Sequence, residues 1–155
     1  MKKDKGQGMV EFALTFSIFI VLVIGILEVA WLFYFYNSIS TASREAARYG
    51  ATLGNNAEGI PHYQDCSGIR NTAKRIAWLA GLQDSDIVIQ VDNGPNTPAT
   101  TVCSPTPVTY INLGDRLSVN VTGHYQPLVN LIKIPNLPLK GVSSYTIMKN
   151  ITVYE

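Results

Sequence analysis

The chain has 155 residues, enough for one modest domain and one additional element. Apolar residues make up 46% of it, and the formal net charge is +1. Residues 54–155 carry seven basic and seven acidic side chains, so this region is neutral. A neutral region without a basic face lacks the electrostatic footprint of nucleic-acid binding, and that class of function is excluded.

The first long element is an apolar stretch, residues 12–36, in which Glu28 is the only charged residue. Its 25 residues would form a helix of about 37 Å, enough to cross a hydrocarbon core of about 30 Å. A cleaved signal peptide has a shorter apolar region, of roughly 7–15 residues. This stretch instead ends in aromatic residues typical of the membrane–water boundary, namely Trp31, Phe33, Tyr34, Phe35 and Tyr36. We therefore expect a retained transmembrane helix in contact with the lipid bilayer.

Three lysines precede this span, Lys2, Lys3 and Lys5, and basic residues favour the cytoplasmic side. They predict a single-pass protein of the inner (cytoplasmic) membrane, with the N-terminus in the cytoplasm and the C-terminal domain outside. Arg44 and Arg48 follow the span, so the charge difference across it is small.

The helix is expected to continue beyond the membrane, because no Pro or Gly interrupts residues 37–49, and to end near 54–56. Small residues recur there at every fourth position: Ser38, Ala42, Ala46 and Gly50. Such a stripe allows another element to approach closely, and that element is either the chain's own domain or a neighbouring helix.

The remainder of the chain predicts an α+β domain, in which one helix packs on an antiparallel sheet of about three strands. Apolar spacing predicts the helix at 67–80, with Ser67 as its N-cap and Gly81 at its end. Alternating apolar and polar residues predict strands at 87–91, 116–125 and 142–153.

Two loops are expected between these strands. Residues 93–107 are rich in Asn, Thr and Pro and predict a long exposed loop. Prolines interrupt residues 127–138, yet this segment carries Leu128, Leu131, Ile132 and Ile134. Its apolar side chains indicate that the loop lies against another surface.

Cys66 and Cys103 are the only cysteines, and both fall on the exported side of the span. An even count in an oxidising compartment favours a disulfide. It would close about 38 residues and contribute about 3–4 kcal/mol in the chain-entropy model. Free thiols, and a zinc site completed by His62 and His124, are the alternatives, although the ligand spacing is poor for zinc.

No catalytic constellation is visible in the sequence. It contains no Gly-x-Ser-x-Gly elbow, no phosphate-binding loop and no paired-carboxylate motif. We expect a protein that is not an enzyme and that has no cofactor, catalytic metal or small-molecule substrate.

Directly before the span stands the segment from Gly6 to Phe12, in which a Gly after a short basic leader precedes Glu11 by five residues. This resembles the processing site of type IV pilin-like proteins. Together with Gly25-Ile26-Leu27-Glu28 and Ala42-Ser43-Arg44-Glu45-Ala46-Ala47-Arg48-Tyr49-Gly50, it is similar to the TadE-like family, minor pilin-like proteins of Tad (tight adherence) pilus systems. The resemblance covers roughly the first 54 residues.

The resemblance implies that a prepilin peptidase cuts between Gly6 and Gln7. A carboxylate inside a membrane helix costs several kcal/mol unless it is paired or near water. Cleavage would place a new α-amino group on Gln7, about one turn from Glu11. Subunit pairing would then involve Gln7, Glu11 and Phe12, whereas without it Glu11 would extend to the headgroups.

Glu28 is a second intramembrane acid. Seventeen residues separate it from Glu11, which puts the two on different helix faces. A separate partner, on a neighbouring pilin or an assembly protein, and extension toward water near Trp31 are the two alternatives for Glu28.

The leading hypothesis divides the chain into a cytoplasmic leader (1–6), a transmembrane helix and stem (7–54) and an extracytoplasmic domain (55–155). It is a structural subunit acting in pilus biogenesis and surface adhesion, with other pilins and the pilus assembly machinery as partners. The alternative is a signal-anchored envelope protein that does not polymerise and carries a binding or secretion-linked domain.

Overall fold

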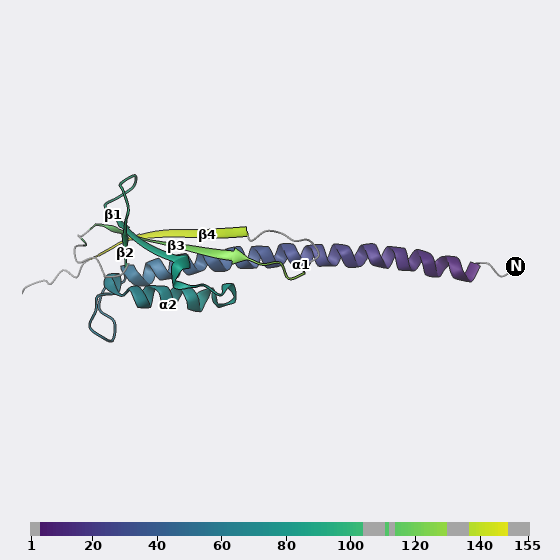
Figure 1. The fold of residues 1–155 in the computed structure, drawn as a ribbon, viewed down its shortest axis with the longest axis horizontal. Helices are drawn as coiled ribbons and strands as arrows, with labels where there is room; N and C mark the ends of the chain where they lie inside the picture. The colour runs from purple at the N-terminus through teal and green to yellow at the C-terminus, as the bar shows by residue number, and fades with distance from the viewer. Residues whose placement is uncertain (1–3, 104–110, 112–113, 130–136, 149–155) are drawn as a thin grey trace, which may run out of the picture.

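One helix, α1 (Asp4–Ala51), runs through the whole molecule (Figure 1). The computed structural model describes residues 4–103, 111, 114–129 and 137–148. At about 1.5 Å per residue, the 48 residues of α1 extend roughly 70 Å. The helix is continuous through Gly8 and Gly25, and it ends at Ala51, three residues before the predicted cap at 54–56.

The N-terminal half of α1 projects alone, while the rest of the chain surrounds its C-terminal half (Figure 1). Among the described residues α1 is the one helix long and apolar enough to cross a membrane, and none of its most apolar window is buried. A core helix of a soluble protein would be mostly covered, so this exposure favours a membrane span.

The remaining elements form a second helix, short 3₁₀ segments and a sheet. In chain order they are η1 (His62–Gln64), α2 (Cys66–Ile76), η2 (Trp78–Ala80), η3 (Asp84–Asp86), β1 (Ile87–Asp92), β2 (Thr100–Val102), β3 (Arg116–Tyr125) and β4 (Leu137–Thr146). The sheet is antiparallel with the order β2-β1-β3-β4. The α+β class is confirmed.

Within the described part of the chain the sheet has four strands, where about three were expected. The additional strand, β2, lies inside residues 93–107, which were predicted to be loop throughout, and pairs with β1 through Val102 and Ile89. The prediction of loop was wrong there because Thr100, Thr101 and Val102 are β-branched and the neighbouring strand offers them a free edge. Residues 104–107 lie outside the described part of the chain.

The last strand begins at Leu137 and not at residue 142 as predicted. Pro138 was read as a strand breaker, but β4 is an edge strand, where a missing N–H need not interrupt the ladder. Within the predicted strand 142–153, Tyr145 lies in β4 and Ile147 is buried just after it. Ile151 and Val153 lie outside the described residues.

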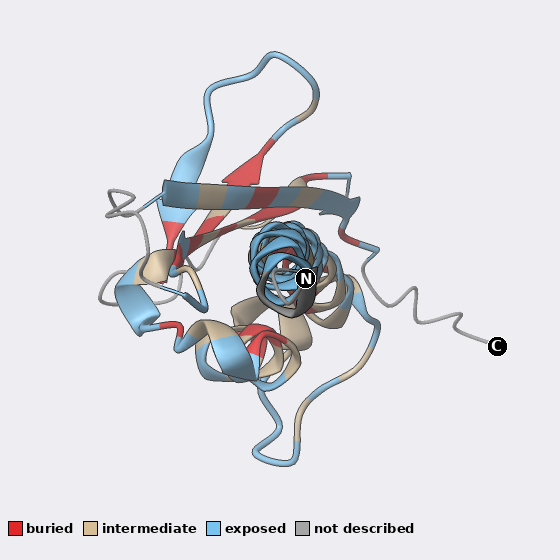
Figure 2. Cartoon of the chain, turned by 90° about the vertical axis from the view of Figure 1, so that its right-hand side faces the viewer, coloured by how far each residue is buried: buried red, intermediate tan, exposed pale blue. Residues whose placement is uncertain are grey.

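The core forms on both sides of α1, which lies between the sheet and α2 (Figure 2). On α1, Ala42, Ala46 and Gly50 are buried and Ser38 is half-buried, so the predicted stripe of small residues packs against the chain's own domain. The other elements also bury apolar side chains in this core. They are Ile69 and Ala73 on α2, Ala77 just after it, Ile87, Ile89 and Val91 on β1, and Leu117, Val119 and Val121 on β3.

The second helix starts one residue earlier than predicted. Its N-cap is Asp65 and not Ser67, because the Asp65 carboxylate accepts a hydrogen bond from the Gly68 N–H at 2.8 Å. The α-helix ends at Ile76, η2 continues it, and Gly81 stops it with a left-handed backbone (φ 58°) as expected.

Cys66 and Cys103 form a disulfide, with 5.7 Å between their Cα atoms. The predicted bridge is confirmed, and the zinc alternative is wrong because both thiols are consumed. The two histidines contact other residues. The His62 ring packs edge-to-face on Tyr49, and His124 Nε2 lies 3.9 Å from Asp86 Oδ1.

Candidate membrane and assembly site

The first turns of α1 carry the segment that the sequence singled out. Gln7, Glu11 and Phe12 are exposed, and Phe12 stacks on Phe16 with ring centroids 5.7 Å apart. Gln7 and Glu11 are one helical turn apart and therefore share a face. No side chain of the described residues donates a hydrogen bond to the Glu11 carboxylate, so its pairing with a Gln7 amino group stays a prediction.

The Glu28 carboxylate, in contrast, accepts hydrogen bonds from three groups among the described residues of its own chain. The Tyr125 hydroxyl donates to it at 3.0 Å, the Leu128 N–H donates at 3.3 Å, and the Val129 N–H donates to its second oxygen. Burial, together with the hydrogen bond to Glu28, raises the pKa of Tyr125. A contact with a neighbouring subunit stays a prediction, but the intramolecular partner was missed. No local sequence pattern predicts a contact between residues about 100 positions apart.

The contacts around Glu28 hold the end of β3 against α1. The Trp31 Nε1–H donates to the Gln126 carbonyl oxygen at 3.2 Å, and Phe35 packs edge-to-face on Tyr125 with ring centroids 5.7 Å apart. The aromatic cluster was predicted as a membrane-boundary belt, but it is divided between two environments. Trp31 and Phe35 face the domain, whereas Phe33, Tyr34 and Tyr36 are exposed.

An apolar groove of about 400 Å³ opens beside this contact. One wall is the middle of α1, and the other is the end of β3 with the first residue of β4. Its lining residues are Val21, Ile24, Gly25, Glu28, Val29 and Leu32 on α1, with Tyr125, Pro127, Val129 and Leu137 opposite.

We expect Glu28→Leu to destabilise the docking of β3 on α1. The change removes the acceptor of one hydroxyl and two N–H groups, so it should lower the free energy of unfolding by about 1–3 kcal/mol. Thermal unfolding of the full chain in detergent, followed by near-ultraviolet circular dichroism, measures it. Glu28→Gln keeps one acceptor oxygen and should lose less. Equal stability of wild type and Glu28→Leu would contradict the assignment.

Asp65 is the centre of a hydrogen-bond cluster at the C-terminal end of α1. Its carboxylate accepts hydrogen bonds from the Gly68 N–H, the Ser67 and Tyr49 hydroxyls and the Asn56 amide, at 2.8–3.0 Å. Burial alone would raise its pKa, but these four bonds outweigh burial and lower the pKa to about 2. Burial and the hydrogen bond to Asp65 raise the pKa of the Tyr49 hydroxyl. The cluster joins the end of α1 to the start of α2.

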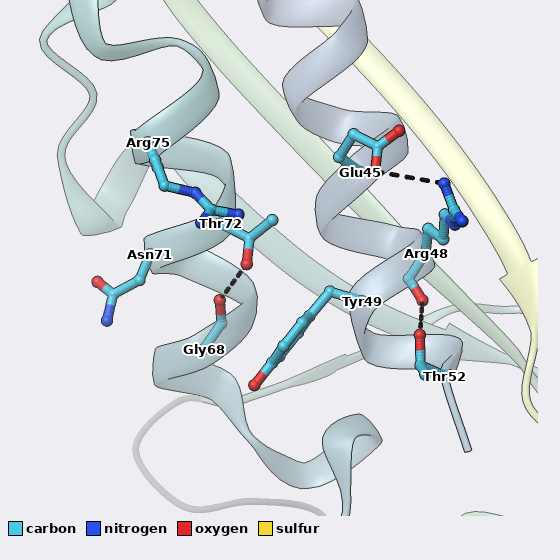
Figure 3. Close-up of a pocket in the computed structure, with 8 residues that line it drawn as sticks. All are labelled: Glu45, Arg48, Tyr49, Thr52, Gly68, Asn71, Thr72 and Arg75. Carbon is cyan, nitrogen blue, oxygen red and sulfur yellow. Dashed lines mark hydrogen bonds and ion pairs between the residues drawn. The ribbon is translucent and has the colours of Figure 1, made fainter. Parts of the chain in front are cut away.

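A second groove, of about 490 Å³, lies between α1 and α2 near this cluster. Figure 3 shows Tyr49 projecting from α1 toward the first turn of α2 beside Gly68, with Arg48 and Arg75 at the sides. Arg48 is paired with Glu45 at 3.8 Å. No group of three or more His, Cys, Asp or Glu side chains in the described ranges could hold a metal ion.

Comparison with known proteins finds one similarity, in the N-terminal part of the chain. The family model described as TadE-like protein matches residues 6–48, which confirms the resemblance inferred from the motifs. The match begins at Gly6, includes Glu11 and Glu28, and ends in the stem of α1. No curated protein and no solved structure matches the chain.

Proposed function

We propose that this protein is a minor pilin-like structural subunit of a Tad-type pilus, acting in pilus biogenesis and surface adhesion. The observation that carries the proposal is the TadE-like match to residues 6–48, which lies within α1 and includes its projecting N-terminal half. The N-terminus would lie in the cytoplasm, α1 would cross the inner membrane, and the α+β domain would lie outside. Other pilin subunits and the assembly machinery are its partners, and no catalytic step is part of this role.

The exposed half of α1 supports this role. Most of its apolar side chains are exposed, Phe12, Ile18 and Val21 to 69–70%, so another apolar surface must cover them. Lipid tails can cover them in the membrane, and the helices of neighbouring subunits can cover them in a filament. A subunit that passes from bilayer to filament needs a helix suited to both environments.

Processing would prepare the helix for assembly. Cleavage by a prepilin peptidase between Gly6 and Gln7 would create an ammonium group one turn from Glu11. Its pairing with Glu11, on the same or an adjacent subunit, would neutralise two charges that are costly in hydrocarbon. Between subunits this pair would set the axial register, with Phe12 packing beside it.

N-terminal sequencing of the membrane form is the first test. A sequence that begins at Gln7 supports the pilin role. A sequence that begins at Met1 or Lys2 contradicts it and favours the signal-anchored envelope protein that does not polymerise.

The second test replaces Glu11. We expect Glu11→Leu to insert and to be processed, but to lower the amount of this subunit in sheared pili about tenfold or more, since a lost charge pair in a low-dielectric site costs more than 1.4 kcal/mol. Immunoblotting of the pilus and membrane fractions measures the change. Glu45→Gln, on the stem outside the apolar stretch, is the matched control and should assemble normally. Wild-type levels of Glu11→Leu in pili would contradict the pairing.

A further inference from the structure

We infer that a third groove, between α1, the η2–η3 segment and the end of β3, binds the headgroup of a phospholipid that carries a primary ammonium group. This groove has a volume of about 680 Å³, and described residues of all these elements line it. The inference goes beyond the proposed function and shares with it one premise, that α1 crosses the membrane.

The groove lies at the end of the domain that faces the membrane. β3 points toward the projecting half of α1 (Figure 1), and its last residue, Tyr125, donates to Glu28 at 3.0 Å. From Gln7 to Glu28 the helix rises about 32 Å, which matches the hydrocarbon thickness of about 30 Å. Trp31 and Phe35 line the groove, about 5 and 10 Å beyond Glu28 along the helix axis. The groove therefore lies where the headgroups of the outer leaflet meet the domain.

The lining of the groove changes from apolar to polar with distance from the membrane. Leu128 is 60% exposed, and its N–H donates to Glu28, which holds it at the hydrocarbon boundary. His124 lies further out, because it precedes the end of β3, and its Nε2 is 3.9 Å from Asp86 Oδ1. A phospholipid has the same order, with its acyl chains in the hydrocarbon and its charged headgroup outside it.

The charge of the groove selects a cationic headgroup. Asp86 is the one formally charged residue that lines it, since the lining contains no lysine or arginine and histidine counts as neutral. The Asp86 side chain is 20% exposed, and its Oδ2 accepts a hydrogen bond from the Gln83 N–H at 2.8 Å. No described residue donates to its Oδ1 within hydrogen-bond distance, so this oxygen can accept from the N–H of an ammonium group.

The other groups of the groove narrow the choice among lipids. An ammonium group bound there also gains attraction from the aromatic rings of Trp31 and Phe35. A choline headgroup has no N–H to donate to Asp86, and an anionic headgroup is repelled by that carboxylate. We therefore expect the groove to prefer phosphatidylethanolamine over phosphatidylcholine and phosphatidylglycerol.

An exposed tryptophan beside the groove favours lipid over a soluble amine. Trp78 is 70% exposed and directly precedes Leu79, which lines the groove and is itself 41% exposed. Tryptophan is enriched at membrane–water interfaces, where its ring contacts the apolar chains and its N–H reaches water. A site for a soluble amine would need no exposed apolar residues around it.

The test measures lipid binding to the full chain in detergent by native mass spectrometry. The three phospholipids, with identical acyl chains, are titrated separately, and the fraction of lipid-bound protein gives each Kd. Asp86→Asn removes the charge and keeps an oxygen that can accept from the Gln83 N–H. Asp84→Asn is the matched control, because it makes the same change in η3 at a residue that is paired with Lys74 and does not line the groove.

We expect phosphatidylethanolamine to bind the wild type about tenfold more tightly than the other two lipids, as for a hydrogen bond between charged groups. Asp86→Asn should lose this preference, and Asp84→Asn should keep it. Equal binding of the three lipids to the wild type, or an unchanged preference in Asp86→Asn, overturns the inference. Displacement of the lipid by an equal concentration of soluble glycerophosphoethanolamine assigns the groove to free amines and also overturns it. These outcomes leave the proposed function standing, since N-terminal sequencing tests that role separately.

Discussion

Gly141→Val is expected to separate the sheet from α1 and to lower the free energy of unfolding by about 3 kcal/mol, the upper end of the usual cost of overpacking. Gly141 is the buried residue of β4, and a Cβ atom added there would lie 2.7 Å from the Ile39 carbonyl oxygen and 3.1 Å from the Ser40 Cα. These are backbone atoms of α1, so no side-chain rotation can relieve the contact. The helix or the strand must move.

The neighbouring packing makes such a movement costly. Gly123, across from Leu139 on the adjacent strand, also faces Ile39, whose side chain would lie 2.5 Å from an added Cβ. On the same face of β4, the Ser143 hydroxyl lies 3.2 Å from the Ser43 hydroxyl of α1, and the two would separate if the strand moved. The closest approach between sheet and helix is therefore centred on Ile39.

Urea unfolding of the full chain in detergent, followed by near-ultraviolet circular dichroism, measures the effect. Lys140→Val is the matched control, because it places the same side chain on the exposed face of the same strand, where substitutions usually change stability by about 0.5 kcal/mol or less. Gly141→Ala should lie between the two. If Gly141→Val unfolds at the same urea concentration as Lys140→Val, the close packing of β4 on α1 is wrong.

Asp65→Ala should have a comparable effect, about 3 kcal/mol. It removes the N-cap of α2, typically worth about 1 kcal/mol, and it leaves the half-buried Tyr49 hydroxyl and Asn56 amide without this acceptor. Since Asp65 joins Tyr49 of α1 to the start of α2, we expect the two helices to loosen together. Thermal unfolding at neutral pH measures this change.

The lowered pKa of Asp65 also predicts a dependence on pH. Its pKa is about 2 in the folded protein and about 3.9 in an unfolded chain, so the folded state binds this proton more weakly. The resulting stabilisation, about 2–3 kcal/mol, is fully present above pH 4 and is lost as the pH falls from about 4 to about 2.

Asp65→Asn isolates this contribution, because the amide keeps one acceptor oxygen and cannot titrate. Asp92, beside Arg116, and Asp84, beside Lys74, also have lowered pKa values and add to the acid sensitivity of every variant. The informative quantity is therefore the difference between wild type and Asp65→Asn, which should shrink between about pH 4 and pH 2. A difference that stays constant through that window would contradict the assigned role of the charge.

Features that depend on local patterns were predictable from the sequence. A long apolar run with one acid specifies α1, since the helical hydrogen bonds and the apolar exterior are both properties of that segment. Strict alternation specifies β1 and β3, because successive side chains point to opposite sides of a strand. The pair of cysteines favoured a disulfide, because no other cysteine was present, and the structure shows the bridge. The motif from Gly6 to Phe12 pointed to the TadE-like match without any tertiary information.

Tertiary structure decided which surfaces meet. β2 forms because β1 offers its β-branched residues a free edge, and β4 starts early because its pairing with β3 outweighs Pro138. Asp65 replaced Ser67 as the cap because Tyr49 and Asn56 converge on it from other elements. Glu28 gained its donors only when the end of β3 folded back along α1, about 100 residues away in the chain. Periodicity reports which face of an element is apolar, but the partner of that face is settled by packing in three dimensions.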